Sequence, residues 1–267
     1  MSAGIRRTDT ILDQIVARKL EEVRALRFTA DFGPRPPTRD FAGALRRADG
    51  RVAVIAEVKR ASPSRGVLID PFDPRALARA YRDGGASALS VLTDRDFFRG
   101  SLDNLRAARD EAGLPTLRKD FIIDVRQIIE ARRAGADAIL LIVAILDDSR
   151  LRDLYTMASD YGLAVLVEVH TEAEMARALR RGAKLIGINN RDLHTFSVDP
   201  DVTRRLARLA PPEVTLVAES GIFTAADVAR AAEAGAHAVL VGESLVRAPD
   251  ISAQVRALGS VEREGQP

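Results

Sequence analysis

AYRDGGASALSVL (residues 80–92) decides the fold of this chain, because its pattern returns in ARRAGADAILLIV (131–143), ALRRGAKLIGINN (178–190) and AAEAGAHAVLVGE (231–243). Each stretch joins the end of an amphipathic helix to a short apolar strand through a break that contains glycine. The copies recur about every 50 residues, roughly twice the length of one strand-plus-helix unit. Short strands that are almost wholly apolar are typical of parallel sheets, so the repeat predicts helices alternating with buried parallel strands.

Eight such strands can be placed along the chain, with helices between them. Their expected ranges are about 52–58, 86–92, 115–119, 136–143, 163–168, 184–189, 214–219 and 236–241. Eight strands in 267 residues favour a closed (βα)8 barrel, the TIM barrel, over an open doubly wound sheet. An open sheet would also carry a glycine-rich turn after its first strand, whereas that strand here leads into Lys59 and Arg60. We therefore predict one α/β domain over residues 1–267, a (βα)8 barrel.

Residues 1–50 precede the first strand and belong to no repeat. Thr10 is a typical N-cap residue, and the four-residue spacing of Ile11 and Ile15 predicts an amphipathic helix after it. A second, short helix is expected at about 38–48. We interpret residues 1–50 as a helical extension that caps one end of the barrel. A second interpretation is that the extension also helps to cover the active site.

Composition narrows the class of protein. The formal net charge is only +2 although 29% of the residues are charged, and no block of like charge indicates nucleic acid or a membrane surface as a partner. The longest apolar run, residues 138–146, is too short to span a bilayer. The chain has no cysteine, and its N-terminal residues lack the apolar core of a secretory signal. We therefore expect a cytoplasmic protein.

Charged and polar residues stand at the ends of the predicted strands, where (βα)8 barrels carry their chemistry. The residues at these ends are Glu57 and Lys59, Lys119, Glu168 and His170, Asn189, Glu219 and Ser220, and Gly242 and Glu243. Burying several charges in one barrel mouth is costly unless the charges pair or take part in chemistry. A desolvated lysine can act as a general acid and a desolvated glutamate as a general base, so we predict an acid–base site.

The last two loops indicate a phosphate site. Ser220-Gly221 and Gly242-Glu243 each place a glycine just after a strand, which lets backbone N–H groups approach an anion closely. The loops after the seventh and eighth strands are the recurrent phosphate site of this fold. Arg191, after the sixth strand, can add a bidentate contact.

Nothing in the sequence points to a metal or to a nucleophile. His170, His194 and His237 are the three histidines, and they lack the spacing of metal ligands. We expect His170 to support Glu168 and His237 to pack at the opposite end of the barrel. The chain also has no Gly-x-Ser-x-Gly nucleophile elbow.

The strand-end segments resemble a known family. IAEVKRASPSRG (55–66) is similar to the first-strand signature of indole-3-glycerol phosphate synthase, an enzyme of tryptophan biosynthesis. Six further matches follow in order: SVLT (90–93) with FFRGS (97–101), LRKDF (117–121), LVEVH (166–170), GINNRDL (187–193), AESGI (218–222) and VGESL (241–245). The resemblance covers residues 10 to 255, including the N-terminal helices.

The resemblance implies an activity. The family converts 1-(2-carboxyphenylamino)-1-deoxyribulose 5-phosphate to indole-3-glycerol phosphate, CO2 and water, without a metal or an organic cofactor. Lys119 would be the general acid, and Glu168 the general base. Lys59 would hold the substrate carboxylate and could act as the acid when hydroxide leaves. Glu57 would position Lys119 or the reacting ring.

The remaining site residues follow from the same resemblance. Asn189 and Ser220 would orient the substrate hydroxyls. Residues expected to bind the phosphate or the benzoate ring, or to line the site, are Ser62, Phe98, Phe121, Arg191, Gly221, Leu240, Gly242 and Glu243. The expected partner is a small phosphorylated molecule, and the protein is expected to be monofunctional and a monomer or weak homodimer.

Two alternatives stay open at this point. One is an enzyme similar to phosphoribosylanthranilate isomerase, although that chemistry usually pairs a cysteine with an aspartate and this chain has no cysteine. The other is a non-catalytic barrel that serves as a partner of tryptophan-pathway enzymes. Loss of Lys119 or Glu168 would favour the second alternative, and both residues are present.

Overall fold

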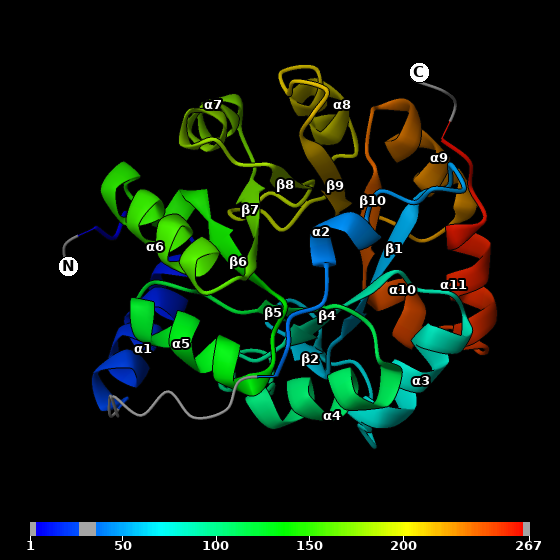
Figure 1. Cartoon of the computed structure of the whole chain (residues 1–267), viewed down its shortest axis with the longest axis horizontal. Helices are drawn as coiled ribbons and strands as arrows, with labels where there is room; N and C mark the ends of the chain where they lie inside the picture. Colours follow the sequence, from blue (N-terminus) through cyan, green and yellow to red (C-terminus); the bar gives the residue numbers. More distant parts are fainter. Residues whose placement is uncertain (1–3, 27–35, 264–267) are drawn as a thin grey trace.

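The computed structural model, which describes residues 4–26 and 36–263, contains a closed barrel of parallel strands (Figure 1). In chain order its strands are β1 (Ala53–Val58), β4 (Ala88–Leu92), β5 (Thr116–Lys119), β6 (Ala138–Ile142), β7 (Ala164–Val169), β8 (Leu185–Asn189), β9 (Thr215–Glu219) and β10 (Ala238–Val241). Each strand pairs with its neighbours in this order, and β1 closes the ring by pairing with both β4 and β10. The predicted (βα)8 barrel is confirmed.

Helices surround the strands on the outside of the barrel (Figure 1). They are α3 (Pro74–Asp83), α4 (Leu102–Ala112), α5 (Val125–Ala134), α6 (Asp148–Asp160), α7 (Glu172–Arg181), α8 (Asp201–Ala207), α9 (Ala225–Glu233) and α11 (Ile251–Gly259). The repeated stretches of the sequence correspond to the ends of α3, α5, α7 and α9 and to the strand that follows each of these helices. Gly135 and Gly182 follow α5 and α7 with φ angles of 89° and 80°, a left-handed conformation that glycine adopts without strain.

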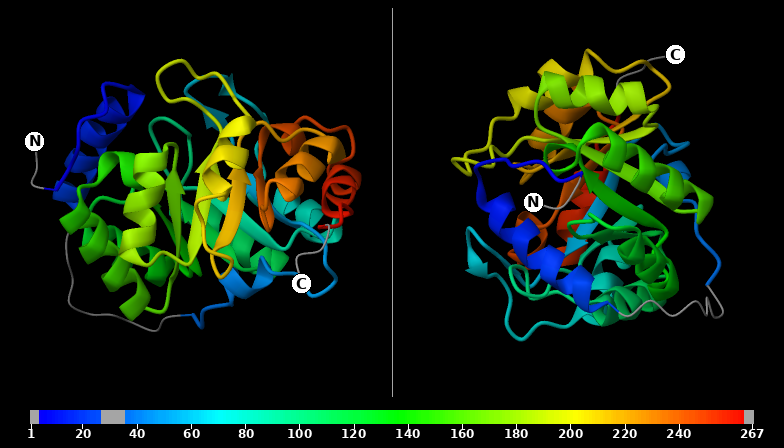
Figure 2. Two further views of the ribbon diagram at one scale, coloured as in Figure 1. Left: turned by 90° about the horizontal axis from the view of Figure 1, so that it is seen from above. Right: turned by 90° about the vertical axis from the view of Figure 1, so that its left-hand side faces the viewer.

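The residues before β1 divide between the two ends of the barrel. Helix α1 (Ile11–Ala25) lies at the end where the strands finish, and α2 (Phe41–Ala44) lies at the end where they begin (Figure 2). At that second end, the backbone N–H of Arg39 donates to Asp137 just before β6, and the Arg46 guanidinium donates to Thr215 at the start of β9.

The second expected helix, at 38–48, is wrong in length. Only Phe41–Ala44 is helical, capped by the Asp40 carboxylate, which accepts from the backbone N–H of Gly43. The chain must then turn back into β1, and Gly50 with a φ of 72° makes part of that turn.

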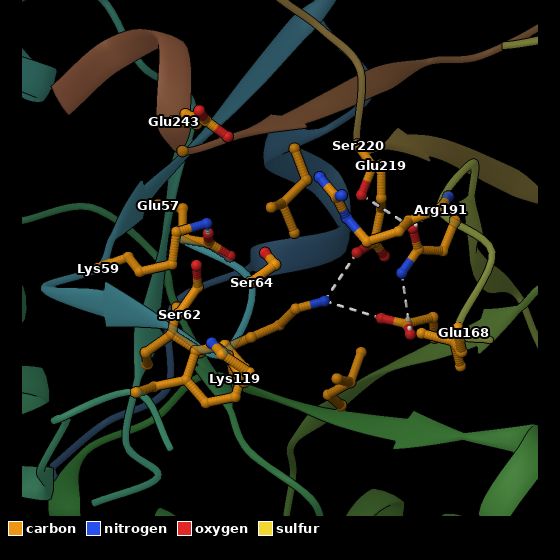
Figure 3. Close-up of a pocket in the computed structure, with 18 of the residues that line it drawn as sticks. Glu57, Lys59, Ser62, Ser64, Lys119, Glu168, Arg191, Glu219, Ser220 and Glu243 are labelled. Atoms are coloured by element: carbon orange, nitrogen blue, oxygen red, sulfur yellow. Dashed lines mark hydrogen bonds and ion pairs between the residues drawn. The ribbon is translucent and has the colours of Figure 1, made fainter. Parts of the chain in front are cut away.

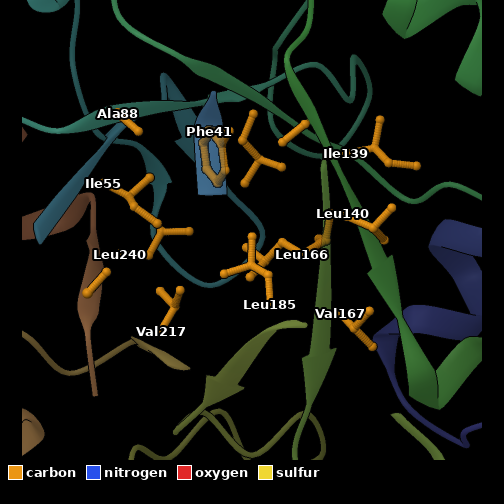
Figure 4. Packing of buried hydrophobic residues seen from close by; sticks show 14 of the residues in the cluster. Phe41, Ile55, Ala88, Ile139, Leu140, Leu166, Val167, Leu185, Val217 and Leu240 are labelled. Carbon is orange, nitrogen blue, oxygen red and sulfur yellow. The ribbon is translucent and has the colours of Figure 1, made fainter. Parts of the chain in front are cut away.

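Phe41 closes the beginning of the barrel. Its side chain is 1% exposed and lies among the barrel residues, with Ile55 of β1 and Leu166 of β7 in the same packed region (Figure 4). Leu45, just after α2, is fully buried as well. Large apolar side chains therefore fill this end of the barrel, as in other barrels of this kind.

A small hairpin after the first strand was not predicted. After β1 the chain forms a hairpin of β2 (Ala61–Ser62) and β3 (Gly66–Val67), which pair antiparallel. The hairpin stands above the end where the strands finish (Figure 2). Among the described residues, no helix is both long and apolar enough to cross a membrane.

Candidate active site

A cavity of about 210 Å³ opens at the end of the barrel where the strands finish. Side chains alternate along a strand, so Glu57 and Lys59 on one strand and Leu140 and Ile142 on another point to the same side, into this cavity. The structure brings every predicted site residue to its wall: Glu57, Lys59, Ser62, Phe98, Lys119, Phe121, Glu168, Asn189, Arg191, Ser220, Gly221, Leu240, Gly242 and Glu243.

Lys119, the last residue of β5, lies at the centre of the site between two carboxylates (Figure 3). Its Nζ donates to Glu168 Oε2 at 2.8 Å and to Glu219 Oε2 at 2.7 Å. Burial opposes the charge of this ammonium, but the nearby carboxylates outweigh that effect and raise the pKa of Lys119 above its usual value. Lys119 is therefore protonated at neutral pH and can act as a proton donor.

The two carboxylates beside Lys119 differ in charge state. Burial raises the pKa of Glu168, but the Lys119 ammonium and His170 outweigh burial and hold this pKa below its usual value. Burial raises the pKa of Glu219 to about 7, and the neighbouring charge of Glu168 adds to that effect. The site thus contains one firmly ionised carboxylate and one that titrates near neutrality, a pattern typical of acid–base chemistry.

Glu219 lies beside Lys119, but the predicted set of site residues omitted it, although the sequence shows it at a strand end. Its side chain is buried, and its Oε1 has no hydrogen-bond partner among the described residues. A Cβ atom at Gly187 in β8 would lie only 2.1 Å from that oxygen. The glycine in the middle of an apolar strand is therefore the sequence signal that could have located this carboxylate.

Lys59 and Glu57 form a second ion pair, with 2.5 Å between Lys59 Nζ and Glu57 Oε1. Glu57 lies in β1 and Lys59 directly follows this strand, so the two side chains point to the same side. The charge of Glu57 also acts on Lys119, and its role toward Lys119 or the reacting ring stays a prediction. A Cβ atom at Gly242 would lie 2.5 Å from Glu57 Oε1, so this glycine makes room for the pair.

Asn189 and Ser220 connect neighbouring strand ends. The Ser220 hydroxyl donates to Asn189 Oδ1 at 2.9 Å, and Asn189 Nδ2 donates to Glu168 Oε1 at 3.2 Å. Ser220 has a φ of 66°, an uncommon conformation for a residue other than glycine. The contacts fix the orientation of the Asn189 amide beside Glu168.

The predicted phosphate-binding residues line the adjoining part of the cavity wall. Gly221 and Gly242 stand at the ends of β9 and β10. Arg191 Nη1 donates a hydrogen bond to the Phe196 carbonyl oxygen at 2.9 Å, and this contact fixes the position of the guanidinium. Both glycines line the cavity wall, as expected for the predicted phosphate site.

An apolar slot makes another part of the wall. The rings of Phe98 and Phe121 lie 6.0 Å apart, centroid to centroid, and tilted by 36°. Leu240 of β10 and two α1 residues, Ile11 and Leu12, line the same cavity. A flat aromatic ring is the kind of group that such a slot accommodates.

The described residues contain no group of three or more His, Cys, Asp and Glu side chains arranged to hold a metal ion. The ion pairs that line the cavity join lysine ammonium groups to glutamate carboxylates.

Comparison with known proteins identifies the family of this chain. The family model described as indole-3-glycerol phosphate synthase matches residues 12–258. The indole-3-glycerol phosphate synthase of Roseiflexus sp. (strain RS-1) is 54% identical over 266 residues, which is 94% of this chain and 98% of that protein. The protein of the same name from Albidiferax ferrireducens is 51% identical over 249 residues, covering 90% of this chain and 94% of its own. The chain belongs to the indole-3-glycerol phosphate synthase family.

Solved structures share the barrel with this member of the synthase family but little of its sequence. The 3-hexulose-6-phosphate synthase of Salmonella typhimurium superposes with a TM-score of 0.62 at 14% identity, covering 78% of this chain and 97% of its own. The orotidine 5'-phosphate decarboxylase of Pyrococcus horikoshii gives 0.59 at 14% identity over 78% and 97%. At these identities the likeness concerns the fold alone.

Helix α1 is attached to the site of this synthase-family chain by a buried ion network. Lys19 is 2% exposed, and its Nζ lies 2.9 Å from Asp94 Oδ2 and 3.0 Å from Asp120 Oδ1. Asp120 directly follows Lys119, and its other oxygen accepts from the Thr93 hydroxyl at 2.6 Å. The sequence did not predict this network, because a lysine in an amphipathic helix is typical of an exposed face.

Proposed function

We propose that Lys119, Glu168 and Glu219 carry out the acid–base steps of indole-3-glycerol phosphate synthesis in this chain. The substrate would be 1-(2-carboxyphenylamino)-1-deoxyribulose 5-phosphate, and the products indole-3-glycerol phosphate, CO2 and water, in tryptophan biosynthesis. The observation that carries the proposal is the Lys119 ammonium held between an ionised carboxylate and one that titrates near pH 7. The family assignment supports the same activity.

Binding precedes chemistry. The substrate phosphate meets the backbone at Gly221 and Gly242 together with Arg191, and its benzoate ring enters the apolar slot lined by Phe98, Phe121 and Leu240. Lys59 pairs with the substrate carboxylate while it keeps its contact with Glu57. Asn189 and Ser220 hold the hydroxyl groups of the sugar chain. These contacts orient the ring carbon toward the ketone and so lower the entropic part of the barrier.

Ring closure is the step that needs an acid. The ring carbon that bears the carboxylate attacks the ketone carbon, and the ketone oxygen gains negative charge. Lys119 donates its proton to that oxygen, since a buried ammonium stabilises a developing oxyanion most strongly. Loss of CO2 then restores the aromatic ring.

Dehydration is the step that needs a base. Glu168 removes a proton from the carbon next to the ring nitrogen, and the hydroxyl leaves as water with a proton from a lysine ammonium, Lys119 or Lys59. Glu168 is suited to this role because it is ionised and buried, which leaves the carboxylate poorly solvated. Glu219 exchanges protons with Lys119 across their 2.7 Å hydrogen bond.

The proposal also covers the domain organisation, the oligomeric state and the cellular location of the protein. Residues 1–267 act as one unit with a small phosphorylated substrate as partner, and as a monomer or weak homodimer, since a single chain supplies all of the predicted site residues. A cytoplasmic location is in keeping with a chain that has no cysteine.

The test is direct. Purified protein is incubated with the carboxyphenylamino deoxyribulose phosphate in the presence of a chelator, and indole fluorescence is followed. The chain has no tryptophan, so the background is low. We expect fluorescence to rise with enzyme concentration. A folded protein that gives no rise would contradict the proposal and favour a non-catalytic partner of tryptophan-pathway enzymes.

A further inference from the structure

The two phenylalanines of the apolar slot come from different loops. Phe98 lies in the loop between β4 and α4, and Phe121 lies just after β5. Their ring centroids are 6.0 Å apart, and both residues line the active-site cavity. Because each ring belongs to its own loop, the width of the slot depends on how the two loops are held relative to each other.

An aspartate holds the backbone of each loop in the same way. Asp94 Oδ1 accepts from the backbone N–H of Phe97, the neighbour of Phe98, at 2.8 Å. Asp120 Oδ1 accepts from the backbone N–H of Phe121 at 2.8 Å. Asp94 is fully buried and Asp120 is 2% exposed. Each buried carboxylate is therefore fixed to the backbone that carries one ring of the slot.

Lys19 of α1 joins these two carboxylates. Its Nζ lies 2.9 Å from Asp94 Oδ2 and 3.0 Å from Asp120 Oδ1. Burial opposes the charge of this ammonium, but Asp120 and Asp94 outweigh burial and raise the pKa of Lys19 above its usual value. Lys19 is therefore charged at neutral pH. Without its charge the two buried carboxylates would repel each other.

The two aspartates do not depend equally on Lys19. Asp120 also forms an ion pair with Arg118 at 3.0 Å and accepts from the Thr93 hydroxyl at 2.6 Å. In the described part of the chain, Asp94 Oδ2 accepts no hydrogen bond, and the ion pair with Lys19 is the contact that holds it. Loss of the Lys19 charge should therefore loosen the loop after β4 and leave the loop after β5 in place.

We propose that Lys19 is a positioning residue that sets the width of the slot and so selects for an unsubstituted benzoate ring. Its charge draws Asp94 toward Asp120, and the loop that carries Phe98 follows. Lys19 is not among the residues that line the cavity, so it acts through the slot and not on the substrate itself. The inference rests on the proposed function, because the ring in question is that of the proposed substrate.

The test compares the carboxyphenylamino deoxyribulose phosphate with an analogue that carries a methyl group on the ring carbon opposite the nitrogen. One carbon more or less in an apolar pocket changes kcat/KM by about 10–200-fold. We expect the wild type to prefer the unsubstituted substrate, and Lys19→Met to reduce this preference about threefold or more. The KM of this variant for the unsubstituted substrate should rise by a larger factor than its kcat falls. The effect of the methyl group on the chemistry itself is the same in every variant, so a changed preference reports the slot.

A second variant separates this role from stability. Asp94→Asn keeps the oxygen that accepts from Phe97 but loses the charge that Lys19 attracts, so it should relax the preference as Lys19→Met does. The double variant leaves no aspartate unpaired, because Asp120 keeps Arg118. Its melting temperature should rise above that of Lys19→Met, while its preference stays as relaxed as in either single variant. A preference that returns together with the melting temperature would mean that Lys19 serves stability alone.

Glu22→Gln is the matched control. Glu22 Oε2 accepts from the same Lys19 Nζ at 2.8 Å, but Glu22 lies in α1 and holds neither loop of the slot. This variant should keep the wild-type preference, because Lys19 keeps both aspartates. Equal losses of kcat/KM for the two substrates in Lys19→Met, or an unchanged preference, overturn the inference. A wild-type protein that converts neither substrate would instead overturn the proposed function.

Discussion

The two ends of the barrel hold the same residue type in opposite states. At the end where the strands finish, burial is outweighed by two carboxylates, and the pKa of His170 rises to about 10. At the end where the strands begin, burial, with Arg263 and Arg46 nearby, lowers the pKa of His237 to about 4. His237 lies just before β10, and its Nδ1 accepts from the backbone N–H of Leu216. The charged groups beside each buried histidine, rather than the residue type, decide its charge.

The difference extends to the surroundings of each histidine. Ion pairs gather at the finishing end, around Lys119 and around Lys59, where burial makes them costly. Phe41 and Leu45 fill the beginning end with apolar contacts. We expect the charged residues at the finishing end to serve activity and the apolar residues at the beginning end to serve stability. Substitutions at the finishing end should therefore lower activity, and substitutions at the beginning end should lower the free energy of unfolding.

The largest effect is expected at Lys119. Lys119→Ala removes the acid and should lower kcat by about a thousandfold, within the usual range for a general acid. Circular dichroism should still report a folded barrel. The matched control is Lys184→Ala, whose side chain is 70% exposed near the start of β8. Activity of Lys119→Ala within a few-fold of the control would show that Lys119 is not the acid.

Phe41→Ala should give the reverse result. It empties a fully packed site at the beginning end and should lower the free energy of unfolding by about 3–5 kcal/mol. The kcat at 25 °C should stay near the wild-type value, because Phe41 does not line the active-site cavity. Urea unfolding measures the first quantity and indole fluorescence the second. Leu209→Ala, at a side chain 46% exposed, is the control and should change neither.

Lys19→Ala tests a residue that we expect to affect both stability and substrate binding. It leaves Asp94 buried without its cation, which costs about 3 kcal/mol of unfolding free energy, whereas Asp120 keeps its ion pair with Arg118. Because α1 also lines the active-site cavity through Ile11 and Leu12, KM should rise as well. Arg24→Ala changes an exposed residue of the same helix and is the control. Unchanged stability and KM in Lys19→Ala would mean that the network does not hold α1.

The sequence predicted one part of the site well and another part poorly, for a physical reason. Lys119 and Glu168 could be found because strand alternation and the strand-end rule place them without knowledge of any partner. The pairing of Glu57 with Lys59 could have been found in the same way, since Glu57 lies in β1 and Lys59 directly follows it. Roles that depend on side chains from distant segments could not be found so simply.

Lys19 and Glu219 illustrate the part that was missed. Lys19 looks like an exposed helix residue until the fold places Asp94 and Asp120 against it. Glu219 was visible at its strand end, but its role depends on the space left by Gly187 in the neighbouring strand. The hairpin β2–β3 was missed because its two-residue strands are too short to leave a periodic pattern.

The smallest effect concerns pH and the two histidines. His237 has a folded pKa of about 4, below the value of 6.5 for a free histidine, so folding disfavours its protonated form. Stability from this residue is complete above pH 6.5 and is lost as pH falls from 6.5 to 4, by at most about 3 kcal/mol. His170 has the opposite sign: its contribution is complete below pH 6.5 and is lost as pH rises toward 10. Urea unfolding of wild type and His237→Gln between pH 4 and pH 7 isolates the first contribution, because the carboxylates contribute equally to both proteins. We expect the variant to lose less stability than the wild type over this range, and identical slopes would show that His237 is not held neutral at the beginning end of the barrel.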